Sequence, residues 1–398
     1  MTSETTAPAS GDSRITCEIC NALVHSVQHH LSREHADLGM TLQDYEAKYP
    51  GKPVLSEMAK QKIADLMADK AAKEAKAASS VSADSCAVAT STKPFHEVFS
   101  LGTGAAAMSA RGKPIPITVV GENDSYGDMI PDIDPNYLFN VDVLKSLMMA
   151  IEMRIPVYLW GHAGTGKTTV FEQIAARTKR PFFRVQHTAN MEEEHIVGGW
   201  RLRDGKTFFE LGPLAMAMKF GWFYMADEYD FGRPEVTSVY QAVLEGKPLV
   251  IKEADEANRV IRPHPNFRIA GTGNTNGQGD EHGIYTGTNI QNSANYERFG
   301  VVEQMPYMEK ALEARLISQQ AGIAVKDAAK LVDFATRIRQ DFDGNKIGNP
   351  ISPRSLIYAA RIGVARDNFR IGLEKAYINR LSPTDRETAT QVAQRVFA

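Results

Sequence analysis

Short runs of bulky apolar residues recur along the middle of the chain, and each is bounded by glycine or polar residues. Runs of this length, rich in aromatic and β-branched residues, predict buried strands. The predicted strands cover residues 156–160, 181–186, 221–228, 266–274 and 301–305. Segments with helical spacing lie between them. This alternation predicts an α/β fold with a five-stranded parallel sheet, whose carboxyl edge collects the polar residues that follow the strands.

The remaining pattern divides the chain further. Helical periodicity over 140–153 leads into the first strand of the sheet, and 115–120 is a further strand-like run. Residues 308–398 are helical in pattern and predict a helical subdomain. The Ala- and Lys-rich residues 54–78 favour a helix, and the Ser-rich residues 79–93 are typical of a flexible linker. After a disordered lead of 1–13, the expected parts are 14–52, 53–94, 95–307 and 308–398.

Two insertions between the predicted strands carry hairpin signals. In the first, Asp204-Gly205 stands between β-prone residues within 198–209. This dipeptide favours a two-residue turn that joins antiparallel strands. A second hairpin is expected within 246–265.

Composition and charge narrow the class of protein. With 398 residues, 43% of them hydrophobic and 23% charged, the chain has the make-up of an ordinary globular protein with two or three domains. Its net charge of −3 excludes a global basic field that would draw it to nucleic acid or membrane. Three cysteines are too few for a disulfide framework, and no leader or 18-residue apolar run is present. We expect a cytoplasmic protein that does not bind membranes.

Residues 161–168 read GHAGTGKT, between a predicted strand and a predicted helix. A glycine-rich turn in this position wraps phosphate oxygens with backbone N–H groups at a helix N-terminus. The lysine of such a loop reaches the β- and γ-phosphates, and the following hydroxyl binds Mg²⁺. The loop therefore predicts a nucleoside-triphosphate site. Its predicted binding residues are Gly161, Gly164, Thr165, Gly166, Lys167, Thr168 and Thr169.

The third predicted strand ends in Asp227-Glu228, which has the form of a Walker B motif. A buried strand that presents two carboxylates at its carboxyl end can serve Mg²⁺ and water together. We expect Asp227 to hold Mg²⁺ with Thr168, and Glu228 to orient and deprotonate the attacking water.

Three further polar residues resemble elements of AAA+ ATPases. Asn274 ends the fourth predicted strand and resembles sensor 1, which helps to place the attacking water. Arg298 precedes the fifth strand and resembles the arginine finger that contacts the γ-phosphate of a neighbouring subunit. Arg354 follows Ser352-Pro353 at a helix start and resembles sensor 2 of the helical lid. Arg233 is a further candidate for contact with a neighbour.

The two hairpin insertions resemble the helix-2-insert AAA+ group that contains the MoxR ATPases. Within it, the chain is most similar to the small ATPase subunit of aerobic cobaltochelatase, over about residues 130–310. The matching pieces are Asp134-Pro135, residues 161–168, 227–230, 232–234 and 259–265, and Asn274-Thr275. The resemblance implies that the first hairpin faces a ring pore or a partner. Candidate contacts there are Trp200, Arg201, Arg203 and Phe208, although the two aromatic residues could instead pack the hairpin itself.

Near the N-terminus, Cys17, Cys20, His30 and His35 follow the pattern C-x2-C-x9-H-x4-H. Two thiolates and two imidazoles suit tetrahedral zinc. His25 and His29 are neighbours, so the choice of imidazoles stays open.

This segment resembles the Ros/MucR-type zinc finger, through the Cys–His spacings and residues 40–49. That resemblance implies DNA binding. However, four basic and five acidic residues in the segment make a poor surface for phosphate, so protein binding is favoured.

The sequence thus predicts an ATP-hydrolysing AAA+ ring, expected to be a hexamer, that remodels a partner protein. The resemblance implies a partner with a von Willebrand factor A-type domain. ATP, Mg²⁺ and Zn²⁺ are the expected cofactors, and the finger would recruit a target or adaptor. Two alternatives stay open: a DNA-binding ATPase that uses the finger on DNA, and the ATPase subunit of a cobaltochelatase.

Overall fold

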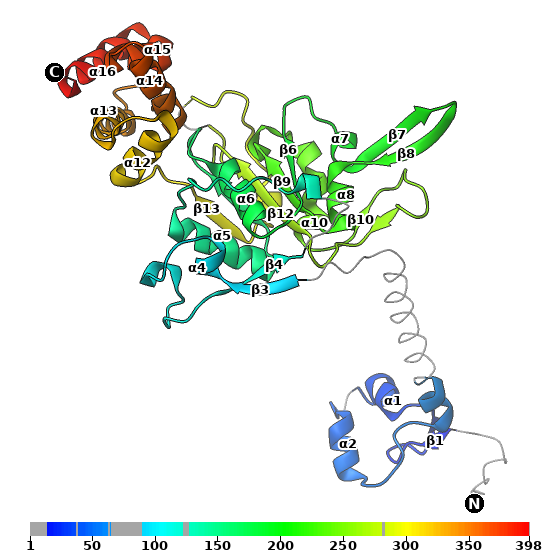
Figure 1. The fold of residues 1–398 in the computed structure, drawn as a ribbon. Coiled ribbons are helices and arrows are strands. Elements are labelled where there is room, and N and C mark those ends of the chain that lie inside the picture. The colour runs from blue at the N-terminus through cyan, green and yellow to red at the C-terminus, as the bar shows by residue number, and fades with distance from the viewer. Residues whose placement is uncertain are drawn as a thin grey trace, which may run out of the picture. The chain divides into compact units, whose positions relative to one another are not determined.

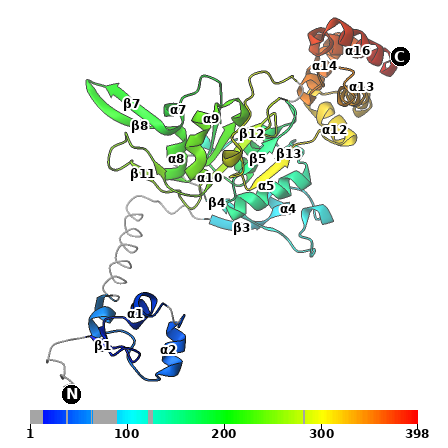
Figure 2. The ribbon, with the colours of Figure 1, turned by 180° about the vertical axis from the view of Figure 1, so that it is seen from behind.

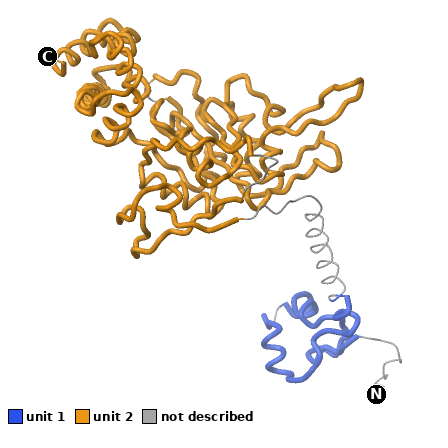
Figure 3. Tube along the Cα trace, viewed as in Figure 1, with its two compact units in different colours: residues 1–86 blue, residues 87–398 orange. Residues whose placement is uncertain are grey.

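The structure is a computed structural model, and it describes residues 14–36, 39–62, 64, 90–121, 127–280 and 283–397. The chain divides into two compact units, residues 1–86 and 87–398 (Figure 3). The predicted lead and most of the predicted linker lie outside the described residues, as does the predicted helix of 54–78 beyond residue 64.

The first unit is a small fold around four buried side chains, Cys17, Val27, Leu31 and Tyr45. Its elements are β1 (Ile15–Thr16), β2 (Leu23–Val24), α1 (Val27–Glu34) and α2 (Leu42–Lys48). β1 and β2 pair antiparallel, and Ser26 caps α1. Residues 54–56 belong to this fold, because Val27 N–H donates to the carbonyl of Val54 and Ser26 pairs with Leu55. The compact fold therefore continues beyond residue 52, and helical backbone begins at residue 57.

The second unit is organised by the predicted five-stranded sheet (Figure 1). Its strands are β5 (Val157–Trp160), β6 (Phe182–Gln186), β9 (Phe223–Asp227), β12 (Arg268–Gly273) and β13 (Val301–Gln304). The strand order is β13-β5-β12-β9-β6, and every pair is parallel. The predicted α/β fold is confirmed.

Helices cover both faces of this sheet. On one face, Val157 and Leu159 of β5 pack in one core with α5 (Val141–Met153) and α6 (Lys167–Arg177). On the other face, Tyr158 packs in a second core with α8 (Pro213–Phe220) and α10 (Gln241–Leu244). Burial on both faces explains why β5 and β9 are nearly continuous apolar runs rather than alternating ones.

The start of the second unit differs from the predicted bounds. β3 (Thr90–Pro94) pairs antiparallel with β4 (Pro116–Val120), so residues 90–94 form a strand rather than the end of the linker. β3 reads Thr-Ser-Thr-Lys-Pro and is mostly exposed, so it carries no apolar alternation. Its pairing with β4, which the sequence does predict as a strand, creates it. Short helices α4 (Phe95–Val98), η2 (Ala105–Ala107) and η3 (Gly127–Met129) accompany this pair.

Both predicted hairpins are present. β7 (Gly198–Arg203) and β8 (Lys206–Leu211) pair antiparallel and turn at Asp204-Gly205, where both residues have positive φ. This arm projects away from the body of the second unit in both ribbon views (Figures 1 and 2). β10 (Leu249–Val250) and β11 (Val260–Ile261) form the second hairpin. The further short helices of this unit are α7 (Glu194–Val197), η4 (Tyr229–Phe231), α9 (Pro234–Thr237), η5 (Ser238–Tyr240) and α11 (Ser293–Tyr296).

The C-terminal part is helical, as predicted. It comprises α12 (Lys310–Ala321), α13 (Val325–Asp343), α14 (Pro353–Ala365), α15 (Phe369–Ala376), η6 (Ile378–Arg380) and α16 (Pro383–Val396). These helices share a separate hydrophobic core that includes Leu331, Phe334 and Leu356. Within the part of the chain that the structure describes, no helix combines the length and the apolar character needed to cross a bilayer.

Candidate functional site

Residues 161–166 form a loop between β5 and α6, and three of its positions require glycine. Gly161, Gly164 and Gly166 have φ values of +151°, +78° and +93°. A Cβ on Gly161 would lie 2.5 Å from the carbonyl oxygen of Met305, and one on Gly164 would lie 2.9 Å from Cβ of Ser352. The loop is therefore pressed between the end of β13 and the start of lid helix α14, and larger side chains are excluded.

α6 begins at Lys167, directly after this loop. The amide groups of Thr168 and Thr169 lie in its first turn and have no carbonyl partner within the helix, which makes them ready donors for phosphate. The hydroxyl of Thr165 donates to the carbonyl of His162 over 2.8 Å and closes the loop.

The buried Lys167 side chain lies across the same loop. Its Nζ donates to the carbonyls of Gly161 at 2.7 Å and His162 at 3.1 Å, and to Oδ1 of Asn274 at 3.1 Å. Burial lowers the pKa of Lys167 to about 8, against the attraction of nearby carboxylates such as Asp230. The predicted sensor residue Asn274 is thus in direct contact with the lysine of the loop.

Asp227 lies at the end of β9, and donors reach both of its carboxylate oxygens. Oδ1 accepts from the hydroxyl of Thr168 at 3.1 Å and from that of Thr272. Oδ2 accepts a hydrogen bond from Nε of Arg184 at 2.7 Å, and Nη2 of the same guanidinium lies 2.5 Å from it in an ion pair. A hydroxyl and a carboxylate oxygen side by side are hard oxygen donors, so Thr168 and Asp227 fit Mg²⁺.

Glu228 follows with a left-handed backbone, at φ +51°. A non-glycine residue in this conformation is uncommon and is typical of functional sites. Its Oε2 accepts from Nε2 of Gln186 over 2.6 Å, and its amide donates to the hydroxyl of Thr272 over 3.2 Å.

Asp230 positions the end of β12. Its Oδ2 accepts from the amides of Asn274 and Thr275 at 2.8 and 2.9 Å, and from the hydroxyl of Thr275. Burial raises the pKa of Asp230, and these hydrogen bonds oppose that rise. The sequence motifs predicted no role for Asp230, Arg184, Gln186 or Thr272. The signal that the sequence did contain is that Arg184 and Gln186 lie in the last three residues of a predicted strand, near the same sheet edge as Asp227.

The two predicted arginines lie in different places. Arg354 is in the first turn of α14, and its charge is close enough to depress the pKa of Lys167. Arg298 precedes β13, at the end of that strand remote from Met305 and the loop. Its Nε donates to Oε1 of Glu245 over 2.6 Å, and it also bonds the carbonyl of Ala294. The structure brings Arg354 to the loop and leaves Arg298 away from it.

The lid also contacts the loop through a row of aromatic and charged groups. His162 stacks on Tyr307, with ring centroids 5.5 Å apart, and meets the edge of Phe342 in α13. The guanidinium of Arg339 lies 3.7 Å from the centre of the Tyr307 ring. Arg339 in turn forms a buried two-bond ion pair with Glu313, both bonds being 2.7 Å.

On the projecting hairpin, Trp200 and Leu202 are 52% and 73% exposed. Arg201 lies near Glu194 and Glu210, and the guanidinium of Arg203 lies over the ring of Phe208. Trp200 also meets the edge of Phe209. Arg233 reaches the carbonyl of Met191 at 3.5 Å, on the same chain.

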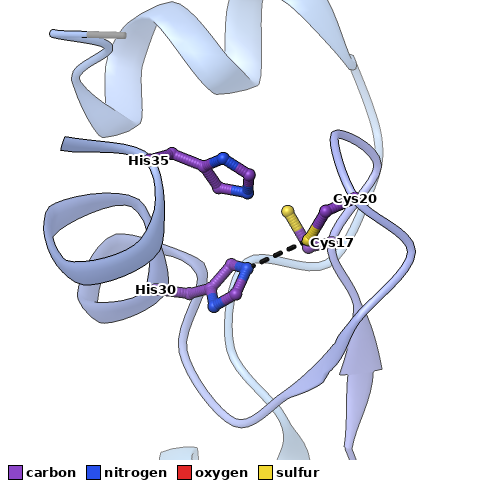
Figure 4. A group of neighbouring side chains, drawn as sticks. All are labelled: Cys17, Cys20, His30 and His35. Atoms are coloured by element: carbon purple, nitrogen blue, oxygen red, sulfur yellow. Dashed lines mark hydrogen bonds between the residues drawn. The ribbon is translucent and has the colours of Figure 1, made fainter. Parts of the chain in front are cut away.

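The first unit contains a separate candidate metal centre, in which Cys17, Cys20, His30 and His35 converge (Figure 4). Their ligand atoms all lie within 4.8 Å of one another, and Cys20 Sγ and His30 Nε2 are 3.1 Å apart. Tetrahedral zinc separates its ligands by roughly 3.3–3.8 Å, so the four fit this ion. Within the described part of the chain, Nε2 of His35 is buried without a hydrogen-bond partner. His25 instead bonds the hydroxyl of Ser56.

Comparison with known proteins gives matches over both subdomains of the second unit. The family model of the AAA domain (dynein-related subfamily) matches residues 156–285, and that of the CbbQ/NirQ/NorQ C-terminal region matches residues 313–396. Aerobic cobaltochelatase subunit CobS of a Sinorhizobium species is 30% identical over 292 residues, which cover 71% of this chain and 86% of CobS. Protein CbbQ of Hydrogenophilus thermoluteolus is 26% identical, with coverages of 67% and 96%. A mutant RuvB structure from Thermotoga maritima aligns with a TM-score of 0.41 and 16% identity, with coverages of 63% and 73%.

Proposed function

The chain belongs to the MoxR-like AAA+ ATPase family that includes CobS and CbbQ, and from this premise we propose that it is a ring-forming ATPase that remodels a partner protein. Hydrolysis of a nucleoside triphosphate with Mg²⁺ is the activity of this family, and it is the activity of this chain. The substrate, the ring and the roles of single residues are the parts we propose.

One observation carries the assignment of the site. Lys167 contacts Asn274 and Thr168 contacts Asp227, so the ends of β5, β9 and β12 meet around a single loop. In the proposed reaction, the loop amides and Lys167 hold the phosphates of ATP. Thr168 and Asp227 would hold Mg²⁺, which neutralises charge on the phosphates when bound. Glu228 takes the proton of the attacking water, and Asn274 orients that water.

The position of Arg298 supports a site that is completed by a second subunit. Arg298 lies at the opposite end of β13 from the loop of its own chain. A guanidinium there reaches a γ-phosphate only in the site of a neighbour, where it would neutralise charge in the transition state. A closed ring of this chain, which we propose to be a hexamer, places one such arginine at every site. Arg354 reaches the site within its own chain from the lid.

The first test is the ATP turnover of Glu228→Gln beside wild type. We expect turnover to fall by about 10²–10⁴-fold, the usual contribution of general base catalysis, with nucleotide binding retained. Glu235→Gln, which makes the same replacement in the nearby short helix α9, serves as the matched control. Wild-type turnover of Glu228→Gln would refute the assigned role of this residue.

The trans role of Arg298 has a separate test. Arg298→Ala and Lys167→Ala chains are each expected to be inactive alone. Mixed, they should regain activity, because some interfaces then pair an intact loop with an intact arginine. Sedimentation with and without nucleotide reports the ring directly. A chain that stays monomeric with nucleotide, or mixtures that stay inactive, would contradict the ring.

The exposed hairpin supports contact with another protein. Trp200 and Leu202 expose large apolar surface at the end of a projecting arm, as interaction sites do. We propose that this arm contacts the remodelled protein or a partner with a von Willebrand factor A-type domain. Glu228→Gln serves as a trap for such partners, and Trp200→Ser in that background should release them.

The first unit supports recruitment through a zinc-bound finger. Cys17, Cys20, His30 and His35 would hold the ion, and because such thiols must stay reduced we propose a cytoplasmic location. We propose a protein target rather than DNA because acidic residues offset the basic ones in this segment. A gel shift of the full chain that weakens steeply with salt would instead support DNA.

A second candidate function is supported by one comparison. The match to CobS covers most of that protein, whose name describes it as a subunit of an aerobic cobaltochelatase. On this reading the chain would power a cobaltochelatase. Capture of chelatase subunits by the Glu228→Gln trap would favour this candidate over remodelling of another target.

A further inference from the structure

Arg184 makes a close contact for which the proposed reaction has no use. Its side chain extends from β6 to the neighbouring strand β9, where Nε donates to Oδ2 of Asp227 and Nη2 forms an ion pair with the same oxygen. The other oxygen of Asp227 accepts from Thr168 and Thr272. The Asp227 carboxylate is 4% exposed, whereas Arg184 is 44% exposed. A buried carboxylate is thus paired with a cation that is itself partly exposed to solvent.

We infer that Arg184 is the counter-ion of Asp227 in the metal-free protein, and that Mg²⁺ must displace it in order to use this carboxylate. The inference rests on the proposed nucleotide site. Arg184 contacts Oδ2 and Thr168 contacts Oδ1, so Mg²⁺ beside Thr168 would bring a second cation to one buried carboxylate, where the two cations repel each other. A guanidinium held by a charge-assisted hydrogen bond is a firm competitor for that carboxylate. Arg184 therefore sets how strongly Mg²⁺ promotes nucleotide binding.

Glu172 offers a place for the displaced guanidinium. It lies in α6 one turn after Thr168, so the two side chains share a face of the helix. No hydrogen bond to the Glu172 carboxylate is found among the described residues, and burial raises its pKa while the charge of Arg184 lowers it. A half-buried carboxylate without a donor gains from a cation. Arg184 would thus move from Asp227 to Glu172 when Mg²⁺ binds.

This role differs in its consequences from two simpler ones. If Arg184 only stabilises the sheet, its loss lowers stability but leaves the preference for Mg²⁺ unchanged. If it only attracts the anionic nucleotide, its loss weakens binding equally with and without the metal. Competition alone changes the ratio of the two affinities. That ratio is also insensitive to the fraction of folded protein in a sample.

The experiment measures the Kd of the full chain for fluorescent mant-AMP-PNP, which is not hydrolysed, in EDTA and in saturating Mg²⁺. The quantity of interest is Kd in EDTA divided by Kd in Mg²⁺. We expect Arg184→Ala to raise this ratio about tenfold, the lower end of what one charge within 4–6 Å does to a neighbouring group, because Arg184 is partly exposed. Arg184→Lys should raise the ratio less, since an ammonium keeps the positive charge but lacks the planar guanidinium that contacts Asp227 through two nitrogens.

Two further variants complete the design. Glu172→Gln should lower the ratio several-fold, because the displaced guanidinium loses its second carboxylate. Arg395→Ala, an exposed arginine of the lid, is the matched control and should leave the ratio unchanged. Suppose that the wild type binds nucleotide better with Mg²⁺ but that Arg184→Ala leaves the ratio unchanged or lowers it. The inference about Arg184 would then be overturned, while the proposed function would stand. A wild-type chain that binds no nucleotide would overturn the proposed function as well.

Discussion

Loss of zinc should unfold the first unit and leave the second intact. Among the described residues of the first unit, the hydrophobic core has only four buried side chains, and one of them is the proposed ligand Cys17. Structural zinc contributes roughly 10–16 kcal/mol in finger peptides, whereas whole small domains are stable by only about 5–15 kcal/mol. Removing the metal therefore removes as much free energy as the unit has in total. Cys17→Ser or His35→Ala should have the same result as a chelator.

The assay is hydrogen exchange of the full chain, followed by mass spectrometry, together with metal analysis. Peptides from α1 and α2 should lose their protection after treatment with a chelator or in Cys17→Ser, while peptides from α6 keep theirs. His29→Ala is the matched control, because this exposed histidine lies on α1 outside the Cys–His cluster. If Cys17→Ser and His35→Ala each keep one zinc per chain and normal protection of α1, the metal centre is wrongly assigned.

Three further predictions concern the second unit. Gly273→Ala should destabilise it by about 3 kcal/mol or more and reduce turnover, because the new Cβ would lie 1.8 Å from Oη of Tyr158; thermal unfolding and ATPase assays measure both effects. Glu313→Gln should cost about 3–5 kcal/mol, since it leaves the buried Arg339 charge without its partner, and faster hydrogen exchange in the lid helices would report the loss. Burial lowers the pKa of His187 to about 4, below its ordinary 6.5, so the folded state binds fewer protons than the unfolded state between these values. The contribution of neutral His187 to the free energy of unfolding is therefore complete above pH 6.5 and falls by about 3 kcal/mol as the pH drops towards 4. Unfolding measured at several pH values should show this fall, and the pH dependence should be weaker in His187→Gln.

The centre of the sheet could be predicted from sequence because strands such as β5 and β9 are buried on both faces. Each of these two is a continuous apolar run, which the pattern of a single chain is enough to reveal. The same pattern could not predict β3, because its residues are mostly polar and form a strand through pairing with β4. The hairpin of β7 and β8 was found through Asp204-Gly205, whose positive φ values are a local requirement. Local signals were therefore sufficient wherever the structure is locally determined.

The site divides in the same way. Lys167, Thr168, Asp227 and Glu228 belong to compact motifs, and their chemistry was apparent before any fold was known. Arg184 acts on Asp227 only because β6 lies beside β9 in the sheet, and the sequence contained no signal for that strand order. Strand pairing joins residues that are far apart in the sequence. A residue whose role depends on such a pairing therefore has no local sequence motif.

The polar contacts of the site suggest why the chain needs a nucleotide and a neighbour to act. Lys167 bonds Asn274, Asp227 pairs with Arg184, and Glu228 accepts from Gln186. Hydrogen bonds of this kind contribute about 0.5–1.5 kcal/mol each, or up to about 3 kcal/mol when a charge is involved, so bound Mg²⁺ and triphosphate are strong enough to replace them one by one. Before Mg²⁺ and triphosphate bind, each of these groups is held in place by a hydrogen bond to another residue of the site. Hydrolysis then depends on exchanging these internal partners for phosphate, metal and water, and a ring can couple that exchange to the position of its neighbour.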